Sequence, residues 1–213
     1  MSAVNKPHHI LLGLGLLCFA GWSHATFVTY TTQDAFIGAT IAAGTDTFDS
    51  LAAGDLPSSI PRTAGAYTYT VSSPSGLFGI DGADRWLSNF DRREGISFSG
   101  FSSAVRAVGG TFFGTNDSGV TLPDQMIRFT VTDTSLAQFA TVLTLNSASS
   151  FFGVVSSTPI LSMLISVEPG NLLAAYPTVN NFVVATVPEP STYALMLLGL
   201  AAIGRTASRR LKR

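Results

Sequence analysis

The residue types that carry most enzyme chemistry are absent from the middle of this 213-residue chain. Residues 26–190 contain no Lys, His or Cys. Lys6, all three His and the single Cys18 come earlier, and Lys212 comes later. Without His, a serine nucleophile of the common triad type has no base, and thiol and Schiff-base chemistry are excluded as well. Carboxylates, hydroxyls, Tyr and Arg are the groups that remain.

A carboxylate pair is the catalytic arrangement still open, because two acids suffice to hydrolyse a glycosidic bond. The candidates are Asp81, Asp84 and Asp91, which surround Trp86 in sequence. Three arginines are interleaved with these acids, so surface ion pairs on a loop explain the run better than catalysis does. We expect a protein that is not an enzyme, with a secreted carboxylate-based glycoside hydrolase as the alternative.

Charge restricts the choice of partner. Residues 26–190 hold 6 Arg and 13 carboxylates, a net charge of −7, although the whole chain carries only −1. Nucleic acid is excluded as a partner, because a phosphate backbone requires a clustered basic surface. A glycan would instead need an exposed aromatic face, and Trp86 is the candidate for that role.

The elements that must position these groups are predicted to be strands. Residues 26–186 are rich in Ser, Thr, Gly, Phe and Val and contain no long segment with apolar residues at helical spacing. Turn signals such as Gly109-Gly110 and Pro177 divide the region. Strands are expected at residues 27–31, 67–72, 96–101, 104–113, 126–132, 139–145, 151–155, 161–167 and 181–186.

Short strands at this spacing indicate an all-β fold, a two-sheet antiparallel β-sandwich of the jelly-roll type. In residues 126–132, Ile127, Phe129 and Val131 share the face predicted to be buried. The less regular residues 34–65 are expected to form loops around one strand at 46–48. Gly109 and Gly110 are interpreted as positions of a bulge or a close backbone approach.

Oxygen donors without imidazole or thiolate favour calcium over a transition metal. Asp46 and Asp49 belong to the first expected core strand, and Asn180 and Asn181 belong to the last. Because first and last strands are often neighbours in a jelly roll, these four residues are the candidate ligands of a structural calcium ion. The alternative is that Asp49 and Asn181 cap turns or bond to nearby backbone.

The first 25 residues have the three parts of a secretory signal peptide. Lys6 precedes an apolar run over residues 10–20, and small residues stand at Ser23 and Ala25. Cleavage is expected after Ala25. It would remove Cys18 and leave a chain without cysteine.

Residues 187–213 also have three parts in a fixed order. Pro188, Glu189 and Pro190 come first, and an apolar stretch of 12 residues follows over 193–204, shorter than the roughly 20 that span a bilayer. The residues expected to anchor this stretch in the membrane are Tyr193, Leu195, Leu197, Leu198, Leu200 and Ile203. Five cations then stop transfer: Arg205, Arg209, Arg210, Lys212 and Arg213. Because such a tail cannot cross a bilayer cheaply, it is expected to stay in the cytoplasm with the rest of the chain outside.

This C-terminal arrangement resembles the PEP-CTERM sorting signal of Gram-negative bacteria that make extracellular polysaccharide. The resemblance implies that an exosortase-type membrane protease recognises Pro188, Glu189 and Pro190. It also implies transient anchoring in the inner membrane, followed by release to the cell surface or to the extracellular matrix of a biofilm.

Phrases in the middle region are similar to an exported jelly-roll domain often found ahead of such signals. They are Thr47-Phe48-Asp49-Ser50-Leu51, Trp86-Leu87-Ser88, residues 107–116, Phe151-Phe152-Gly153-Val154 and residues 179–184. This resemblance implies a lectin-like architecture and extracellular polysaccharide as a partner.

The sequence thus predicts a signal peptide over residues 1–25, a β-sandwich over 26–186 and a sorting segment with a transmembrane helix over 187–213. The expected function is that of an exported surface or matrix protein that is structural, adhesive or glycan-binding.

Overall fold

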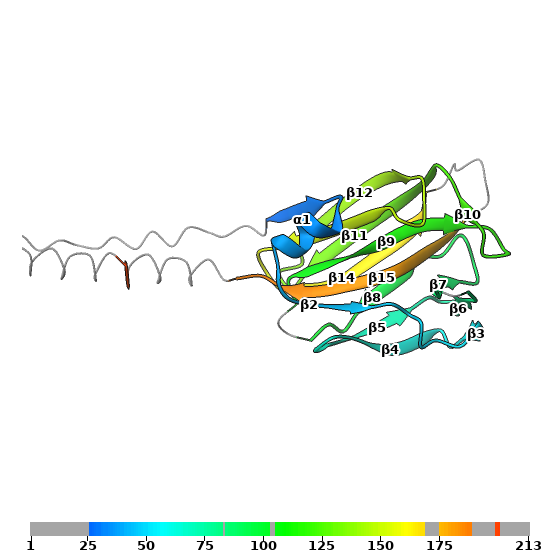
Figure 1. The fold of residues 1–213 in the computed structure, drawn as a ribbon, viewed down its shortest axis with the longest axis horizontal. Helices are drawn as coiled ribbons and strands as arrows, with labels where there is room; N and C mark the ends of the chain where they lie inside the picture. Colours follow the sequence, from blue (N-terminus) through cyan, green and yellow to red (C-terminus); the bar gives the residue numbers. More distant parts are fainter. Residues whose placement is uncertain (1–25, 83, 103–104, 169–174, 189–198, 201–213) are drawn as a thin grey trace, which may run out of the picture.

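The computed structural model describes residues 26–82, 84–102, 105–168, 175–188, 199 and 200. Two antiparallel sheets pack face to face, which confirms the predicted all-β sandwich (Figure 1). The nine-stranded sheet contains β1 (Phe27–Tyr30), β2 (Ile41–Asp46), β3 (Gly54–Leu56), β6 (Leu77–Ile80), β7 (Trp86–Asn89), β9 (Ala107–Thr115), β10 (Thr121–Leu122), β13 (Phe151–Ser156) and β15 (Tyr176–Thr186). The six-stranded sheet contains β4 (Ser59–Ala64), β5 (Tyr67–Ser72), β8 (Ile96–Ser99), β11 (Gln125–Asp133), β12 (Gln138–Leu145) and β14 (Ile160–Val167).

The last strand in the sequence is central in the fold. The nine-stranded sheet has the order β1-β13-β9-β15-β7-β6-β3, and the six-stranded sheet has the order β12-β11-β14-β8-β5-β4. One edge of β15 pairs with β9, and its other edge is shared by two strands. Val179 lies opposite Leu87 of β7, whereas Phe182 lies opposite Asp46 of β2. The β15–β9 register shifts just after Asn180, where the partner on the other edge changes.

Alternation of apolar and hydroxyl side chains builds the six-stranded sheet. In β11, Ile127, Phe129 and Val131 are buried and the residues between them face outward, as predicted. In β5, Tyr69 and Val71 are buried in the same way. Every second residue of these strands therefore belongs to an outer face, and most of these outer residues are Ser or Thr.

Aromatic rings from the two inner faces meet in the core. Phe98 of the six-stranded sheet stacks on Phe182 of the other, with ring centroids 4.2 Å apart and planes at 15°. Phe129 meets Phe112 edge to face at 5.1 Å. All four rings are fully buried. Burial of each such side chain contributes about 2 to 3 kcal/mol, so these pairs are a principal source of stability in a sandwich without disulfides.

Residues 33–64 hold more regular structure than predicted. They form α1 (Gln33–Gly38), β2, β3 and β4 rather than loops around one strand at 46–48. The expected strand at 46–48 is wrong beyond Asp46, because β2 ends there and the chain turns, with a φ of 61° at Phe48. The glycine that interrupts the sequence pattern of β2 has a steric reason. A Cβ atom on Gly44 would lie 2.1 Å from the carbonyl oxygen of Ala64.

Two predicted turns lie inside strands. Pro177 is part of β15, opposite Gly114 of β9, and a proline near the beginning of a strand removes at most one ladder hydrogen bond. Gly109 and Gly110 lie in β9, where a Cβ atom on Gly110 would approach the Cα atom of Phe182 to 3.3 Å. The interpretation of these glycines as a close backbone approach is confirmed. The prediction also omitted β6, β7 and β10.

The short helix α1 covers part of the outer face of the nine-stranded sheet. Its Phe36 is fully buried and contacts Phe151 of β13, with ring centroids 5.5 Å apart. A Cβ atom on Gly153 would lie 2.5 Å from the Phe36 ring. The helix can therefore settle on the sheet only because residue 153 lacks a side chain.

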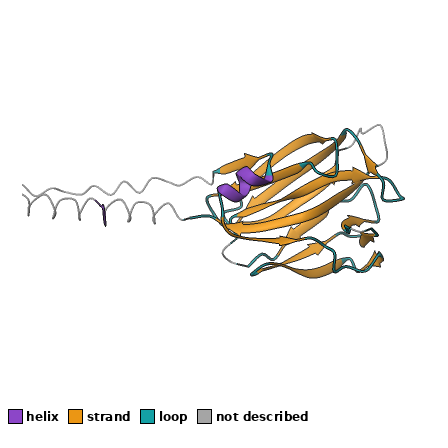
Figure 2. Cartoon of the chain, in the orientation of Figure 1, coloured by secondary structure: helices purple, strands orange, loops and turns teal. Residues whose placement is uncertain are grey.

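All strand pairings of the described structure lie between Phe27 and Thr186. Residues 26–188, called the body below, therefore contain every strand with its partners (Figure 2). The beginning of β1 and the end of β15 lie at the same end of the sandwich (Figure 1). The backbone of Arg106 joins them, because its N–H donates to Ala185 and its carbonyl accepts from Ser156, the residue opposite Phe27.

Candidate functional site

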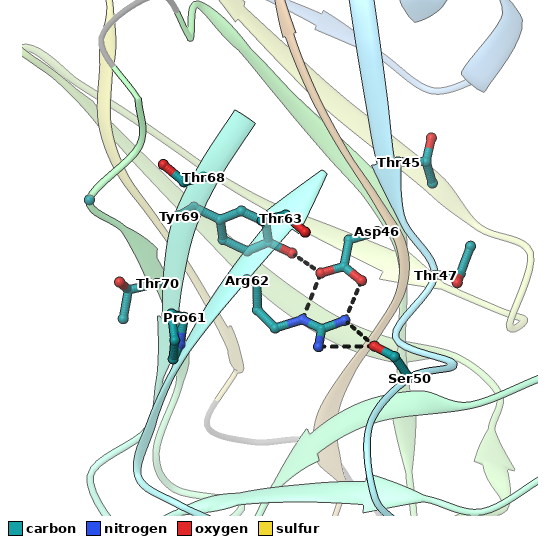
Figure 3. A pocket seen from close by; sticks show the side chains of 11 residues that line it. Thr45, Asp46, Thr47, Ser50, Pro61, Arg62, Thr63, Thr68, Tyr69 and Thr70 are labelled. Atoms are coloured by element: carbon teal, nitrogen blue, oxygen red, sulfur yellow. Dashed lines mark hydrogen bonds and ion pairs between the residues drawn. The ribbon is translucent and has the colours of Figure 1, made fainter. Parts of the chain in front are cut away.

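A pocket of about 560 Å³ lies between β2, β4 and β5 (Figure 3). Seven of its lining residues carry hydroxyl groups, and its two charged residues are Asp46 and Arg62. The full lining is Thr45, Asp46, Thr47, Ser50, Pro61, Arg62, Thr63, Thr68, Tyr69, Thr70 and Gly100. We call it the hydroxyl pocket.

Its floor is an ion pair that joins the two sheets. Asp46 comes from β2 of the nine-stranded sheet, and Arg62 comes from β4 of the other. Arg62 donates from Nε to Oδ2 of Asp46 at 2.8 Å and from Nη2 to Oδ1 at 2.5 Å. The Tyr69 hydroxyl donates to Oδ2 at 2.7 Å, and the backbone N–H of Phe48 donates to Oδ1 at 3.0 Å. Four hydrogen bonds fill the acceptor positions of this carboxylate.

The turn after β2 holds the carboxylate in place. The Phe48 N–H reaches back two residues to the Asp46 side chain, which is an Asx turn. This bond and the complete burial of its ring hold Phe48 at positive φ. The same ring lies 5.5 Å from the Arg62 guanidinium carbon, close enough for a cation–π contact.

Burial and charge act together on the two other members of the network. Burial lowers the pKa of Arg62, but hydrogen bonding to Asp46 and the charge of that carboxylate outweigh it and raise the pKa. Burial, followed by the Asp46 charge, raises the pKa of Tyr69. At neutral pH, Arg62 is therefore charged and Tyr69 is a protonated donor, and the pocket floor is an internally neutralised pair.

A line of hydroxyl groups extends from the pocket across the six-stranded sheet. Thr70 of β5 lies opposite Ser99 of β8, Ser99 lies opposite Ser162 of β14, and Ser162 lies opposite Thr132 of β11. We call these four residues the hydroxyl row. Neighbouring strands lie about 4.8 Å apart, so the row presents hydroxyls at that interval. Further hydroxyls face the same side: Ser59, Thr63, Thr68, Ser72, Ser97, Thr130 and Ser166.

The pocket and the row offer neutral hydrogen-bond donors and acceptors. An anion finds no free cation in the pocket, because Arg62 is already engaged by Asp46 at two points. A metal ion finds no free carboxylate there, because Asp46 is saturated. The arrangement suits a neutral ligand that carries many hydroxyl groups of its own.

The structure brings the four candidate calcium ligands to one flank of the sandwich. β2 and β15 are neighbours, as the prediction required, and Phe182 of β15 pairs with Asp46. Asp49 accepts a hydrogen bond from the backbone N–H of Arg85 at 3.1 Å. The Asn180 amide donates to Asp84 at 2.8 Å and accepts from the N–H of Asn181 at 2.7 Å.

These oxygen atoms are poorly suited to calcium in the observed arrangement. Asp46 has no free acceptor position, and the Asn180 oxygen is engaged by its own neighbour. Hydrogen bonds from Thr47 and from the Arg85 backbone lower the pKa of Asp49. In the described part of the chain, no three His, Cys, Asp or Glu side chains gather closely enough to hold a metal ion. The calcium ion stays a prediction from the sequence.

Trp86 begins β7 of the nine-stranded sheet, and the three acids around it lie in the loops before and after that strand. Trp86 is partly buried in β7 and meets Phe113 edge to face at 4.8 Å. Asp84 accepts from Asn180, and Asp81 lies 3.7 Å from Arg85 in an exposed ion pair. Asp91 accepts from a backbone N–H two residues later. Trp86 and the three acids are absent from the hydroxyl pocket.

A smaller pocket of about 180 Å³ is lined by Phe78, Phe90, Tyr176 and Asn89, among others. Asn89 is 4% exposed, and its amide nitrogen donates to Ser73 and to the Glu94 carbonyl. Its amide oxygen has no donor within the described residues.

Sequence reasoning missed the hydroxyl pocket, apart from Asp46, which it assigned to calcium. Arg62 was the available signal, because it is the only basic residue of the sequence between residues 26 and 84, in a segment predicted to be loop. The alternation Tyr67-Thr68-Tyr69-Thr70 predicts an outward Thr face. Which strands would lie beside that face depends on the topology, which the alternation does not contain.

Comparison with known proteins adds an assignment for the C-terminal segment. Residues 186–213 match the model of the PEP-CTERM protein-sorting motif. The C-terminal segment is a PEP-CTERM motif. This confirms the resemblance drawn from Pro188, Glu189 and Pro190. Of the PEP-CTERM residues, Pro188 follows β15 by two positions and is half-buried.

The remaining predicted residues of the PEP-CTERM motif lie outside the described residues, except Leu200, which is exposed. The signal peptide and Ala25 lie outside them as well. No helix within the described ranges has the length and apolar character needed to cross a membrane.

The solved CBM22-1 xylan-binding domain of Paenibacillus barcinonensis Xyn10C is similar at a TM-score of 0.36 and 16% identity, over 70% of this chain and 96% of that domain. No curated protein matches the chain.

Proposed function

We propose that this chain is an exported, exosortase-sorted protein of the cell surface or extracellular matrix, and that its body binds neutral polysaccharide without cleaving it. The hydroxyl pocket and the hydroxyl row carry the binding part of the proposal. The PEP-CTERM motif supports the sorting part.

Sorting fits the way the motif is attached to the body. β15 ends at Thr186, and Pro188 follows two residues later. Cleavage near Pro188-Glu189-Pro190 would leave the whole of this central strand in the body. In this proposal the signal peptide directs export, residues 193–204 hold the chain in the inner membrane for a time, and an exosortase-type protease removes them.

Neutral polysaccharide fits the chemistry of the six-stranded face. Seven of the lining residues carry hydroxyl groups, and the ion pair among them has no free charge. Thr70 belongs to both the pocket and the hydroxyl row. A polymer that enters the pocket can therefore continue across the strands with a hydroxyl within reach at each one.

Charge predicts whether the body should prefer neutral or acidic polysaccharides. Residues 26–190 carry a net charge of −7, and the exposed Arg128 of this sheet is paired with Glu168 at 2.7 Å. An acidic polysaccharide would be repelled by the body as a whole. Neutral chains are therefore expected to bind better than acidic ones.

Binding of the body to the neutral and acidic polysaccharides of the producing organism tests this function. The double substitution Thr68→Val and Thr70→Val keeps side-chain shape but removes two pocket hydroxyls, and we expect at least a tenfold loss of affinity. Thr144→Val removes a hydroxyl from β12, outside the pocket, and should leave affinity unchanged.

Two results would count against polysaccharide binding without cleavage. Equal affinity of the double variant and the unchanged body would remove the hydroxyl pocket as the site. Release of reducing ends that Asp81→Asn, Asp84→Asn or Asp91→Asn abolishes would establish the hydrolase alternative.

The sorting part has an independent test. The intact mass of the protein recovered from the cell surface should correspond to a chain that begins after Ala25 and ends near Pro188-Glu189-Pro190. An extracellular species that still contains Arg213 would contradict exosortase processing.

A further inference from the structure

Strand β12 is an edge of the six-stranded sheet, and within the described residues no further strand pairs with it. It pairs with β11 over eight residues, Gln138 to Leu145, and it ends the strand order of the sheet. It contains no charged residue, no Pro and no Gly. Long, uncharged edge strands of this kind invite pairing with another strand.

The other ends of the two strand orders are protected by length or by proline. The nine-stranded sheet ends in β1 and β3, which have four and three residues. The opposite edge of the six-stranded sheet is β4, with Pro61 near its centre. Because Ser73 donates to Ser58 and the register continues from there, the backbone of residue 61 faces away from β5. Pro61 thus removes a donor that would otherwise face outward.

The hydrogen-bond pattern shows which groups of β12 face outward. Asp133 donates to the Ala137 carbonyl, and the β11–β12 register continues without a shift. Backbone groups of every second residue from 137 onward therefore point to β11, and those of the intervening residues point away from it. The outward set is Gln138, Ala140, Val142 and Thr144.

The sequence of β12 is self-complementary about Thr141. In an antiparallel pair centred on this residue, Ala140 lies opposite Val142 of a second copy, and Gln138 lies opposite Thr144. On the inner face, Phe139 lies opposite Leu143. Apolar residues meet apolar ones and polar residues meet polar ones, and the outward backbone groups oppose each other as the ladder requires.

We propose that β12 pairs with β12 of a second copy of this chain, antiparallel and centred on Thr141, to form a continuous sheet of twelve strands. The contact is two-fold symmetric and uses the same edge on both copies. Because Pro61 blocks the opposite edge of this sheet, the assembly closes as a dimer and does not extend into a fibre.

The substitution Val142→Pro tests the pairing directly in the body. The Val142 N–H has no partner in β11, so proline removes only the bond to the second copy, as Pro61 does on β4. We expect the unchanged body to sediment as a dimer and Val142→Pro to sediment as a monomer with an unchanged far-ultraviolet circular dichroism spectrum. Val142→Thr keeps the N–H and should remain dimeric. A monomeric unchanged body, or a dimeric and folded Val142→Pro variant, would overturn the proposal.

A cysteine substitution tests the register and does not depend on whether proline is tolerated. The body contains no Cys, so Thr141→Cys introduces a single thiol at the centre of the pairing. Non-hydrogen-bonded antiparallel neighbours have Cα atoms about 4.5 Å apart, within the range of a disulfide. Oxidation should link Thr141→Cys into covalent dimers and leave the matched Thr144→Cys variant, three residues away, unlinked. Equal linking of both variants, or linking of neither, would contradict the register.

Discussion

Arg62 and Asp46, from opposite sheets, form a two-point ion pair beneath the hydroxyl pocket (Figure 3). The Asp46 side chain is 4% exposed and that of Arg62 is 13% exposed. A buried carboxylate is tolerated here because four donors surround it. The pair neutralises the pocket floor and at the same time holds β2 beside β4.

Loss of the arginine should therefore be costly. We expect Arg62→Met to lower the free energy of unfolding of the body by about 3 to 5 kcal/mol, because it leaves Asp46 buried without a counter-ion. Denaturant titration measures this change. Arg128→Met, which breaks the exposed pair with Glu168, is the matched control and should cost much less, because solvent screens an exposed ion pair. Equal losses of unfolding free energy in the two variants would show that the buried Arg62–Asp46 pair stabilises the body no more than the exposed pair does.

The contact between β2 and β4 depends on a glycine. Gly44→Ala places a methyl group 2.1 Å from the Ala64 carbonyl oxygen, so the two strands must separate. We expect destabilisation by more than about 2 kcal/mol and weaker binding of polysaccharide. Gly38→Ala at the end of α1 is the control, since no atom lies within 4 Å of its added methyl. An unchanged melting temperature for Gly44→Ala would contradict the close approach.

Stability should fall in acid. Burial raises the pKa of Asp133, but hydrogen bonds from Ser135, Thr158 and the backbone outweigh it and lower the pKa below 3.8. A carboxyl group whose pKa is lower in the folded chain stabilises it fully above the unfolded pKa and loses that contribution as pH falls through the folded value. We expect the free energy of unfolding to decline below about pH 4.

Asp133→Asn checks the source of this pH dependence. The variant should be less stable at pH 7 and should lose less stability between pH 5 and pH 3 than the unchanged body. Glu168→Gln affects a group whose pKa Arg128 lowers in an exposed pair, and solvent screening should make its effect smaller. An unaltered acid slope in Asp133→Asn would remove this residue as a cause.

The calcium prediction can be decided by thermal unfolding. Because Asp46 and Asn180 have their oxygens engaged, we expect the same melting temperature in calcium, in chelator and in magnesium at constant ionic strength. A rise confined to calcium would contradict this expectation and support the site predicted from Asp46, Asp49, Asn180 and Asn181. An ion at about 100 times its dissociation constant would add about 2.7 kcal/mol.

The local sequence pattern predicted the strands in which apolar and polar residues alternate without interruption. The faces of β5 and β11 follow from Tyr69, Val71 and Ile127 and their neighbours, because a two-residue period places successive side chains on opposite faces. The PEP-CTERM segment could be predicted equally well, because its proline, apolar and basic parts follow one another along the chain.

The hydroxyl pocket could not be predicted in the same way. Asp46 meets Arg62 only because β15 brings β2 into one sheet while β4 joins the other, and no local pattern records this topology. Strand β2 was also hard to predict, because its sequence is rich in Ala and Gly and Phe48 just after it has a positive φ. The calcium hypothesis required β2 and β15 to be neighbours, which they are. It did not include Arg62, which binds Asp46 at two points.

Chemical-shift perturbation in the ¹⁵N-labelled body, titrated with neutral oligosaccharides of increasing length, tests the central claim most directly. We expect shifts at Thr68 and Thr70 with short oligosaccharides, extending to Ser99, Ser162 and Thr132 as the oligosaccharide lengthens. Shifts confined to the neighbourhood of Trp86 or Asn89, or no shifts with any neutral oligosaccharide, would contradict it.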